Sequence, residues 1–519
     1  MTKLHHSLVL GVSALALAGC GADEIVSPGT GGNITINNPP APAPSPTPTP
    51  TPTQAVTPAN GCPTISDAQG LTDDGTITGP TGEYRICTLP ARFNTSSNLP
   101  FIEGLLYRMN GRVDVGTDGG PTPSGSDTDV TLSIEPGVIV YASGSSFLFV
   151  NRGNRIDAVG TASRPIIFTS RDDVLGLNNA NSSGQWGGVV LGGRAPVTDC
   201  IAPAATPGTV DCERQVEGAA QPAIFGGATP DDDSGNLEFV QIKYSGFVLS
   251  GDNELQSLTT GGTGSGTTFN NVMSYNSSDD GVEFFGGFVN MKNLVVVGAE
   301  DDSIDTDTGV KANLQYVVAV QRQEVGDTII EADSNNGLEG QTPRQNTQIS
   351  NATFVQRKTD DQVVRIRGGT DYALVNTVIV DASQGTPCLR IDLPETLQAT
   401  GADENGPPVF ESLVLDCDDA FRSGSGGVSE AQVRAVFDAG SNNNANFSNT
   451  LTMTYINGAN EDAVPAFDPT ALSSFFDSVS FIGAAQAGDT RFEGWTCDSP
   501  AVSFGNNTGS CIGIPVFTN

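Results

Sequence analysis

Histidine and positive charge are scarce in this chain. Its 519 residues include two histidines, 24 lysines and arginines, and 59 aspartates and glutamates, for a formal net charge of −35. His5 and His6 both precede the first cysteine, so removal of that stretch would leave no imidazole. Such a chain lacks Ser-His-Asp and Cys-His catalysis and histidine-ligated zinc. The negative charge also disfavours nucleic acid and anionic membrane surfaces as partners.

Apolar runs long enough to span a membrane are absent as well. The N-terminal run at residues 8–17 follows Lys3 and is too short for a bilayer core of ~30 Å, which indicates a signal sequence. Leu17-Ala-Gly-Cys20 resembles the lipobox of bacterial lipoproteins. That resemblance implies cleavage before Cys20 and acylation of its thiol. With Gly21 after the cysteine it also implies an outer-membrane lipid anchor. An ordinary secretory signal with an incidental cysteine is the alternative.

Composition divides the rest of the chain. Residues 20–61 include the alternating prolines of 39–53, which favour a polyproline II tether of ~3.1 Å per residue. We expect the signal peptide at 1–19, the lipidated tether at 20–61, an N-terminal cap or irregular β region at 62–129, the main repeat region at 130–425, and a C-terminal cap region at 426–519.

Eight cysteines remain after Cys20, and an even number in an exported protein indicates disulfides. No Cys-x-x-Cys spacing supports a metal-thiolate site. Locality favours pairing between sequence neighbours, although other connectivities stay open. The expected pairs are Cys62–Cys87, Cys200–Cys212, Cys388–Cys417 and Cys497–Cys511.

Short β-type runs separated by Gly, Asn, Asp and Ser follow residue 62, and the one clear helical pattern lies at 429–437. Internal repetition decides the architecture, because residues 271–283 align with 293–305 at a constant offset of 22, and a third copy opens at Asn313. This period predicts an all-β parallel β-helix, in which recurrent asparagines at a turn form a ladder. A β-sandwich array is the competing architecture.

Several segments resemble right-handed β-helical bacterial surface lipoproteins, a largely uncharacterised family. They are residues 134–139, 156–170, 184–196, 474–484 and 493–496. The resemblance covers roughly residues 130–500. It implies an exported β-helix and no particular activity.

An acidic cluster is the sharpest chemical feature. The 22-residue offset would place Asp279 and Asp280 one rung, about 4.8 Å, from Asp301 and Asp302. Carboxylates at that spacing repel unless a cation or shared protons intervene, and hard oxygen ligands suit calcium. The predicted metal ligands are Asp279, Asp280, Asp301, Asp302, Asp305 and Asp307. Solvated turn aspartates are the alternative, and Asp231–Asp233 is a weaker candidate that we interpret as an exposed turn.

A catalytic interpretation rests on a second resemblance. Paired aspartates on adjacent rungs, together with Arg365-Ile-Arg367, resemble polygalacturonases, whose carboxylates act as acid and base on a glycosidic bond. The resemblance implies that an arginine binds a substrate carboxylate, but that family's Gly-His-Gly element is missing. Lyase chemistry with calcium-bound carboxylates and an arginine base is also open. Otherwise the arginines pair with nearby acids such as Asp360 and Asp361. Trp186 and Trp495 are more typical of core or cap positions than of sugar-stacking platforms.

Together these features predict a membrane-anchored, surface-displayed β-helical lipoprotein that is a non-catalytic binding or structural component of the envelope, with calcium as its candidate stabilising ion. Its expected partners are membrane lipid through Cys20 and a polysaccharide or outer-membrane protein. The alternative is a polysaccharide hydrolase or lyase using the carboxylates at 279–307. A purely structural envelope component is the third interpretation.

Overall fold

The computed structural model describes residues 55–216, 222–248, 255–334, 337–399, 403 and 406–518. The predicted signal sequence, Cys20 and the proline-rich segment through residue 54 lie outside the described residues. None of the helices within these ranges combines the length and the apolar character needed to cross a bilayer.

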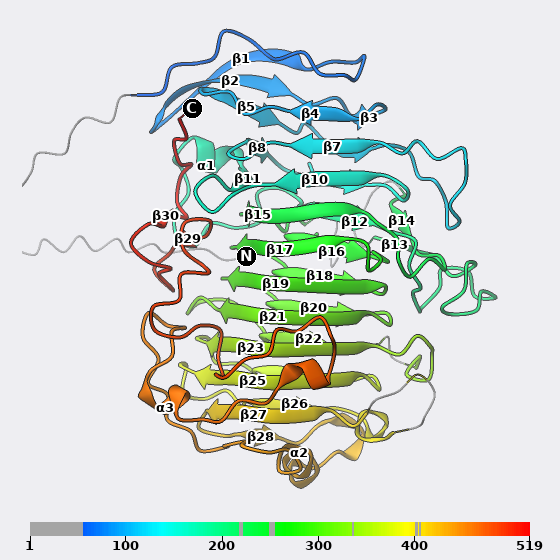
Figure 1. Cartoon of the computed structure of the whole chain (residues 1–519), viewed down its shortest axis with the longest axis vertical. Helices are drawn as coiled ribbons and strands as arrows, with labels where there is room; N and C mark the ends of the chain where they lie inside the picture. The colour runs from blue at the N-terminus through cyan, green and yellow to red at the C-terminus, as the bar shows by residue number, and fades with distance from the viewer. Residues whose placement is uncertain are drawn as a thin grey trace, which may run out of the picture. The chain divides into compact units, whose positions relative to one another are not determined.

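Two long sheets form the body (Figure 1). Sheet A contains fifteen strands: β1 (Thr72–Gly79), β2 (Gly82–Thr88), β4 (Ser97–Leu99), β5 (Leu105–Arg108), β7 (Thr131–Ile134), β8 (Ile139–Ala142), β10 (Arg155–Val159), β11 (Ile166–Ser170), β15 (Gly235–Lys243), β17 (Thr268–Tyr275), β19 (Phe288–Val297), β21 (Lys311–Val320), β23 (Asn346–Gln356), β25 (Asp371–Asp381) and β27 (Val409–Asp416). Sheet B contains eleven: β3 (Arg92–Phe93), β6 (Val113–Val115), β9 (Leu148–Val150), β12 (Val189–Gly192), β16 (Leu258–Gly261), β18 (Val282–Phe285), β20 (Ile304–Asp307), β22 (Ile330–Ala332), β24 (Val364–Ile366), β26 (Leu389–Ile391) and β28 (Phe421–Arg422).

Neighbouring strands in both sheets run parallel, apart from the antiparallel pair β1–β2 at one end. From β15 to β28 the chain alternates between sheet A and sheet B, so each turn adds one strand to each sheet. Parallel strands joined in this way form a solenoid in which each turn contacts only its neighbours. The all-β parallel β-helix is therefore confirmed, and the β-sandwich alternative is wrong.

The repeat of 22 residues holds for one step and then changes. Val282 pairs with Ile304, as the aligned segments predict. The prediction that the third copy opens at Asn313 is wrong in register, because Asn313 pairs with Asn290, 23 residues earlier. Tyr316 consequently stands at the position that Asn293 holds one turn before. The turns differ in length, so a fixed offset cannot be extended along the stack.

A bend divides each long strand of sheet A at a residue with positive φ. The bend residues include Asn271, Asn293, Asn351 and Asn376, whose φ values lie between 50° and 58°. Asparagine tolerates this left-handed conformation better than other residues with a Cβ. The Asn293 side-chain amide donates to the side-chain oxygen Oδ1 of Asn271 at 3.4 Å, a short version of the expected ladder. At Asn351 and Asn376 the amides instead hold the C-terminal segment.

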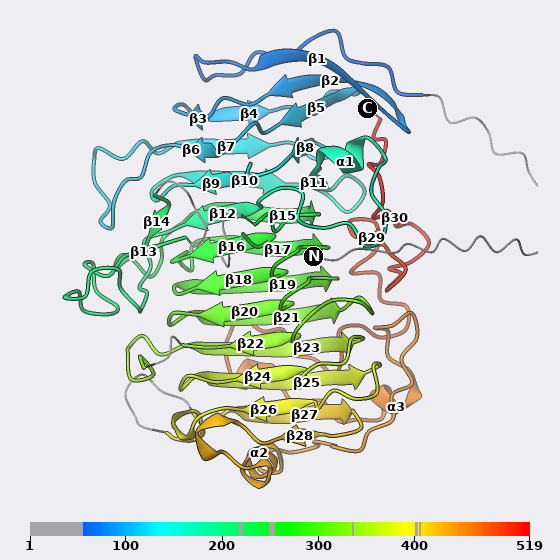
Figure 2. The ribbon, with the colours of Figure 1, turned by 180° about the vertical axis from the view of Figure 1, so that it is seen from behind.

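Alternate residues of the sheet A strands enter two different cores. Leu294 and Val296 of β19 lie in the interior of the solenoid, whereas Val295 and Val297 lie on its outer face. The C-terminal segment 447–511 covers that outer face with side chains such as Phe492 and Trp495. Figures 1 and 2 show this segment, in orange and red, returning along the stack after the last turn. Its own short strands, β29 (Cys497–Asp498) and β30 (Gly509–Ser510), pair with each other.

The remaining elements are short. Helix α2 (Glu430–Phe437) matches the predicted helix, begins after Ser429, and packs Phe437 against Phe421 of the last turn. The others are α1 (Arg171–Val174), α3 (Ala459–Asp462), the antiparallel pair β13 (Arg214–Gln215) and β14 (Ile224–Phe225), and single 3₁₀ turns at Pro394–Leu397, Ser425–Gly427 and Pro469–Ala471.

The eight cysteines of the described residues form four disulfides. The bonds join sequence neighbours, as locality predicts: Cys62–Cys87, Cys200–Cys212, Cys388–Cys417 and Cys497–Cys511.

Candidate cation-binding face

Sheet B has a strongly charged outer face. Ile304 and Thr306 of β20 are buried, while Asp305 and Asp307 between and after them are only half-buried. This alternation follows from strand geometry, which points successive side chains to opposite faces. The acids of β20 therefore lie on the outside of the solenoid.

The outward residues of neighbouring strands stand in register. Glu283, Asp305 and Glu331 occupy one position on β18, β20 and β22. The same position continues with Arg365, Arg390 and Arg422 on β24, β26 and β28. Neighbouring strands lie about 4.8 Å apart, so three acids and three arginines form one continuous row.

A second acidic row precedes these strands in the turns that lead from sheet A to sheet B. Asp279 and Asp280 lie just before β18, and Asp301 and Asp302 lie just before β20. The next turn supplies Asp327, which stands three residues before Ile330 as Asp301 stands three before Ile304. Ile304 and Ile330 are 26 residues apart, so the constant offset of 22 missed Asp327.

Three overlapping groups of carboxylates result. One joins Asp279, Asp280 and Asp301, and another joins Asp301, Asp302 and Asp327. The third joins Asp280, Glu283 and Asp305. Within each group, one oxygen per residue lies within 4.8 Å of the others. The structure thus brings together five of the six predicted metal ligands and adds Glu283 and Asp327.

Backbone and hydroxyl donors fix the two most buried aspartates. The Asp280 carboxylate accepts a hydrogen bond from the Asp302 backbone N–H at 2.9 Å. The Asp302 carboxylate accepts the backbone N–H of Thr328 at 2.8 Å and its hydroxyl. These bonds link three successive turns and orient the acids before any ligand arrives.

Burial raises the pKa of the Asp280, Asp302 and Asp305 carboxyls well above their usual range, and neighbouring carboxylates raise it further. Partial loss of water around its carboxyl raises the pKa of Asp301 even though the residue is exposed overall, with Glu331 adding to the shift. Burial raises the pKa of Asp327 to about 6, with Asp360 and Asp301 as its neighbours. Loss of water and like-charge repulsion both disfavour ionisation. A positive ion among these groups would reverse both effects.

Asp307 lies apart from the three groups. Burial raises its pKa to about 6, although its carboxylate accepts the Thr308 backbone N–H. Arg214 and Arg367 are the cations that face it. Within the described residues, no cluster of ligand atoms includes Asp307, so the sixth predicted ligand does not join the others.

The donor set fits a hard divalent cation. Oxygens bound to one calcium ion at ~2.3–2.6 Å can lie at most about 5 Å apart, and those of each group lie within 4.8 Å. In addition, Oδ1 of Asp305 is buried and accepts no hydrogen bond in the part of the chain that the structure describes. A buried oxygen without a donor is costly in an apoprotein and is suited to coordinate an ion.

The arginines beside this face already form ion pairs. Arg365 forms ion pairs with Glu331 and Asp392, both at 2.9 Å. Arg367 pairs with Glu331 at 3.1 Å and with Asp333 at 2.8 Å. The prediction that they pair with local acids was correct in kind, but the partners lie on adjacent turns instead of at Asp360 and Asp361. Each guanidinium is shared between two carboxylates, which disfavours a role as a base or as an anchor for a substrate carboxylate.

Neither tryptophan offers a surface for stacking sugars. Trp186 is buried in the interior and donates to the Lys243 carbonyl at 2.8 Å. Trp495 belongs to the C-terminal segment, is buried between it and the outer face of sheet A, and donates to the Arg491 carbonyl at 2.7 Å. Both are core residues, as the sequence predicts.

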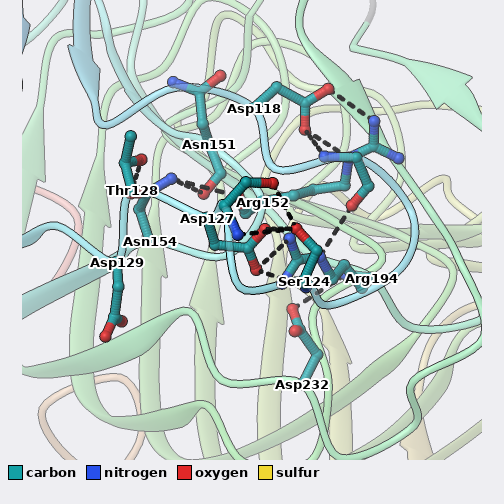
Figure 3. A network of polar contacts seen from close by, with 12 residues as sticks. Asp118, Ser124, Asp127, Thr128, Asp129, Asn151, Arg152, Asn154, Arg194 and Asp232 are labelled. Atoms are coloured by element: carbon teal, nitrogen blue, oxygen red, sulfur yellow. Dashed lines mark hydrogen bonds and ion pairs between the residues drawn. The ribbon is translucent and has the colours of Figure 1, made fainter.

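A second polar network was missed by the sequence analysis (Figure 3). The buried Arg152 forms ion pairs with Asp118 and Glu213, both at 2.6 Å, and the buried Arg194 pairs with Asp127 at 2.8 Å. Asp232 accepts the Arg194 backbone N–H at 2.9 Å and is buried, so the interpretation of 231–233 as an exposed turn was wrong at its centre. The acids come from three separate loops, and this network fastens those loops to the solenoid.

Comparison with known families gives a match. The family model described as a pectate-lyase-like β-helix domain matches residues 123–407, more than half of the chain. No curated protein and no solved structure matches the sequence significantly.

Proposed function

The chain belongs to the pectate-lyase-like β-helix family, and on that premise we propose that it is an exported, lipid-anchored binding protein whose sheet B face holds calcium. The observation that carries the proposal is the set of three overlapping carboxylate groups beside arginines that are already ion-paired. The first feature supplies ligands for a cation. The second leaves no spare cationic side chain in the row for acid–base work on a substrate.

Anchoring rests on the sequence and on disulfides. The lipobox-like Leu17–Cys20 segment supports acylation of Cys20 and attachment to membrane lipid, and the proline-rich segment supports display away from the membrane. Four disulfides are typical of an oxidising compartment outside the cytosol. Mass spectrometry of the N-terminal peptide tests this part: a diacylated Cys20 is expected, and an unmodified thiol would remove the anchor.

Bound calcium would stabilise this face and would also provide a binding site for an external ligand. An ion bound across adjacent turns would neutralise carboxylates whose ionisation burial opposes. Any coordination position that the protein leaves open could take an oxygen of an external ligand, such as a polysaccharide or an outer-membrane protein. The protein's own residues would bind and orient that ligand without breaking a bond.

Differential scanning calorimetry of the whole chain tests the ion. Calcium at a hundredfold excess over its Kd should stabilise the fold by about 2.7 kcal/mol, and EDTA should remove that gain. Asp301→Asn is the informative variant because Asp301 is exposed and belongs to two of the groups. It should lower calcium affinity by at least about tenfold while leaving the apo melting temperature nearly unchanged.

Asp418→Asn is the matched control, since Asp418 is an exposed turn aspartate outside the groups. It should bind calcium like the parent chain. A melting temperature that is equal in calcium and in EDTA, or equal calcium affinity in the Asp301 variant, would contradict the proposal.

Catalysis on an acidic polysaccharide is the second candidate, favoured by the family match and by carboxylates on adjacent turns. Incubation with polygalacturonate, followed by measurement of reducing ends and of unsaturated products, tests it. Turnover that Asp302→Asn abolishes, with native calorimetry and circular dichroism, would replace the binding function by a hydrolase or lyase. Absence of both products in the presence of calcium would favour binding alone.

A further inference from the structure

A separate cavity lies where the C-terminal segment crosses the ends of the sheet A strands. Its volume is about 190 Å³, and none of its lining residues belongs to the three carboxylate groups. The residues that matter to its chemistry are Tyr275, Val297, Arg322, Arg357, Pro500 and Ala501.

Fixed backbone forms the walls of this cavity. The buried Asn276 amide donates to the Ala180 carbonyl at 2.8 Å and to the Ser182 carbonyl at 3.0 Å, which holds the loop before β12 in place. Elsewhere in the lining, the turn at 499–502 is closed by a hydrogen bond from the Ser499 N–H to the Val502 carbonyl at 2.9 Å. The disulfide Cys497–Cys511 brackets that turn. The cavity is therefore built in advance.

Its two guanidinium groups differ in their partners. Arg322 is buried and forms an ion pair with Glu300 at 2.5 Å. Arg357 is half-buried and forms no ion pair or hydrogen bond within the described residues. In a chain with 59 acids and 24 bases, a half-buried guanidinium without a carboxylate is unexpected. An unpaired cation that lines a cavity is suited to an incoming anion.

The rest of the lining limits what that anion can be. Pro500 and Ala501 present apolar surface, whereas Tyr275 and Val297 belong to the lining but are buried. Burial raises the pKa of Tyr275 to about 12, which keeps the phenol neutral. Glu324 lies exposed in the lining and repels a second negative charge. An apolar cavity of about 150 Å³ admits one benzene ring, so this one has room for a ring and a carboxylate.

We propose that this cavity binds a small monocarboxylate with a compact apolar body. The Arg357 guanidinium holds the carboxylate through charge-assisted hydrogen bonds, and the apolar body packs on Pro500 and Ala501. The site is independent of calcium, because it shares no residue with the three carboxylate groups.

Isothermal titration of the whole chain with benzoate and phenylacetate tests the site, with benzamide as the neutral isostere. Both acids should bind with a Kd in the range of about 1 mM, and benzamide at least about tenfold more weakly. Arg357→Gln should weaken benzoate binding about tenfold. Arg171→Gln is the matched control, because Arg171 is exposed, forms no ion pair among the described residues, and lies outside the cavity.

Ala501→Leu provides a test that leaves charge unchanged. The longer side chain should fill part of the cavity and weaken benzoate binding, whereas simple attraction to a surface arginine would be unaffected. The proposal is overturned if neither acid binds at about 10 mM, if benzamide binds as well as benzoate, or if Arg357→Gln and Arg171→Gln behave alike. EDTA should not alter benzoate binding, so failure here is distinct from failure of the calcium proposal.

Discussion

The Lys243 ammonium lies 2.7 Å from the Asp173 carboxylate, and the two side chains are 1% and 0% exposed. Asp173 belongs to α1 and Lys243 ends β15, but the ammonium also donates to the Cys511 and Gly513 carbonyls, each at 3.0 Å. The Gly513 N–H donates back to Asp173 at 2.7 Å. One buried ion pair thus fastens the end of the chain to the N-terminal half of the stack.

Lys243→Met should destabilise the fold by about 3–5 kcal/mol, because it leaves the Asp173 charge buried without its partner. Urea denaturation measures the change. Lys292→Met is the matched control, since the Lys292–Asp477 pair is partly exposed. That control should cost at most about 1 kcal/mol. Similar losses of stability in the two variants would show that the buried pair contributes little to the stability of the fold.

Asp67 should contribute stability that depends on pH. Burial raises its pKa, but hydrogen bonds from the backbone N–H groups of Gln69, Asn94 and Thr95 outweigh burial and hold the pKa below its usual value. A pKa that is depressed in the folded state gives stability that is present above the unfolded pKa of about 3.9 and is lost as the pH falls through the folded pKa.

Asp67→Asn should therefore lower the free energy of unfolding by about 1–3 kcal/mol at pH 7. The difference in this free energy from the parent chain should shrink below about pH 4. Urea unfolding at a series of pH values measures this difference. Asp418→Asn is the matched control, because Asp418 is exposed. A constant difference between Asp67→Asn and the parent across the range would contradict the assignment.

Asn376 should stabilise the docked C-terminal segment. Its amide donates to the Phe467 carbonyl at 2.9 Å and its oxygen accepts the Phe467 N–H at 2.7 Å, while φ is 50°. Asn376→Gly loses both hydrogen bonds and should lower the free energy of unfolding by about 1–3 kcal/mol, as measured by thermal unfolding. Asn376→Ala should cost about 1 kcal/mol more, because alanine resists a positive φ.

Asn442→Ala isolates the backbone effect, since Asn442 is exposed with a φ of 58°. It should cost only about 1 kcal/mol. An equal loss for Asn376→Ala and Asn442→Ala would mean that the contact with Phe467 contributes nothing.

The disulfide Cys388–Cys417 closes a loop with a sequence separation of 29. Replacing both cysteines by alanine should lower the free energy of unfolding by about 3–4 kcal/mol, mainly because the unfolded chain gains freedom. The disulfide Cys200–Cys212 closes a loop with a separation of 12, so the corresponding double variant should lose less. Chemical denaturation of both variants measures the ranking, and a reversed order would contradict it.

The sequence predicted the fold and part of the acidic face for one physical reason. Stacked turns of equal length repeat their residues, so Asp279 and Asp301 could be aligned without a structure. The prediction failed where turn length changes, at Tyr316 and at Asp327, because the pairing follows strand register and not residue count.

Contacts made by the returning C-terminal segment could not be predicted either. Lys243 meets Asp173 and Gly513 only after the whole stack has formed, and no repeat links these positions. Arg357 gave no signal in the sequence, because a missing ion pair is visible only when the surroundings of a side chain are known.

The position of the C-terminal segment 447–511 has a consequence for the export proposed above. In a chain exported with its N-terminus first, this segment crosses the membrane last. The valines on the outer face of sheet A would therefore stay exposed after the turns of the solenoid have formed. During export, the apolar outer face of sheet A would then be exposed for a time. A chaperone of the receiving compartment would be able to bind that face.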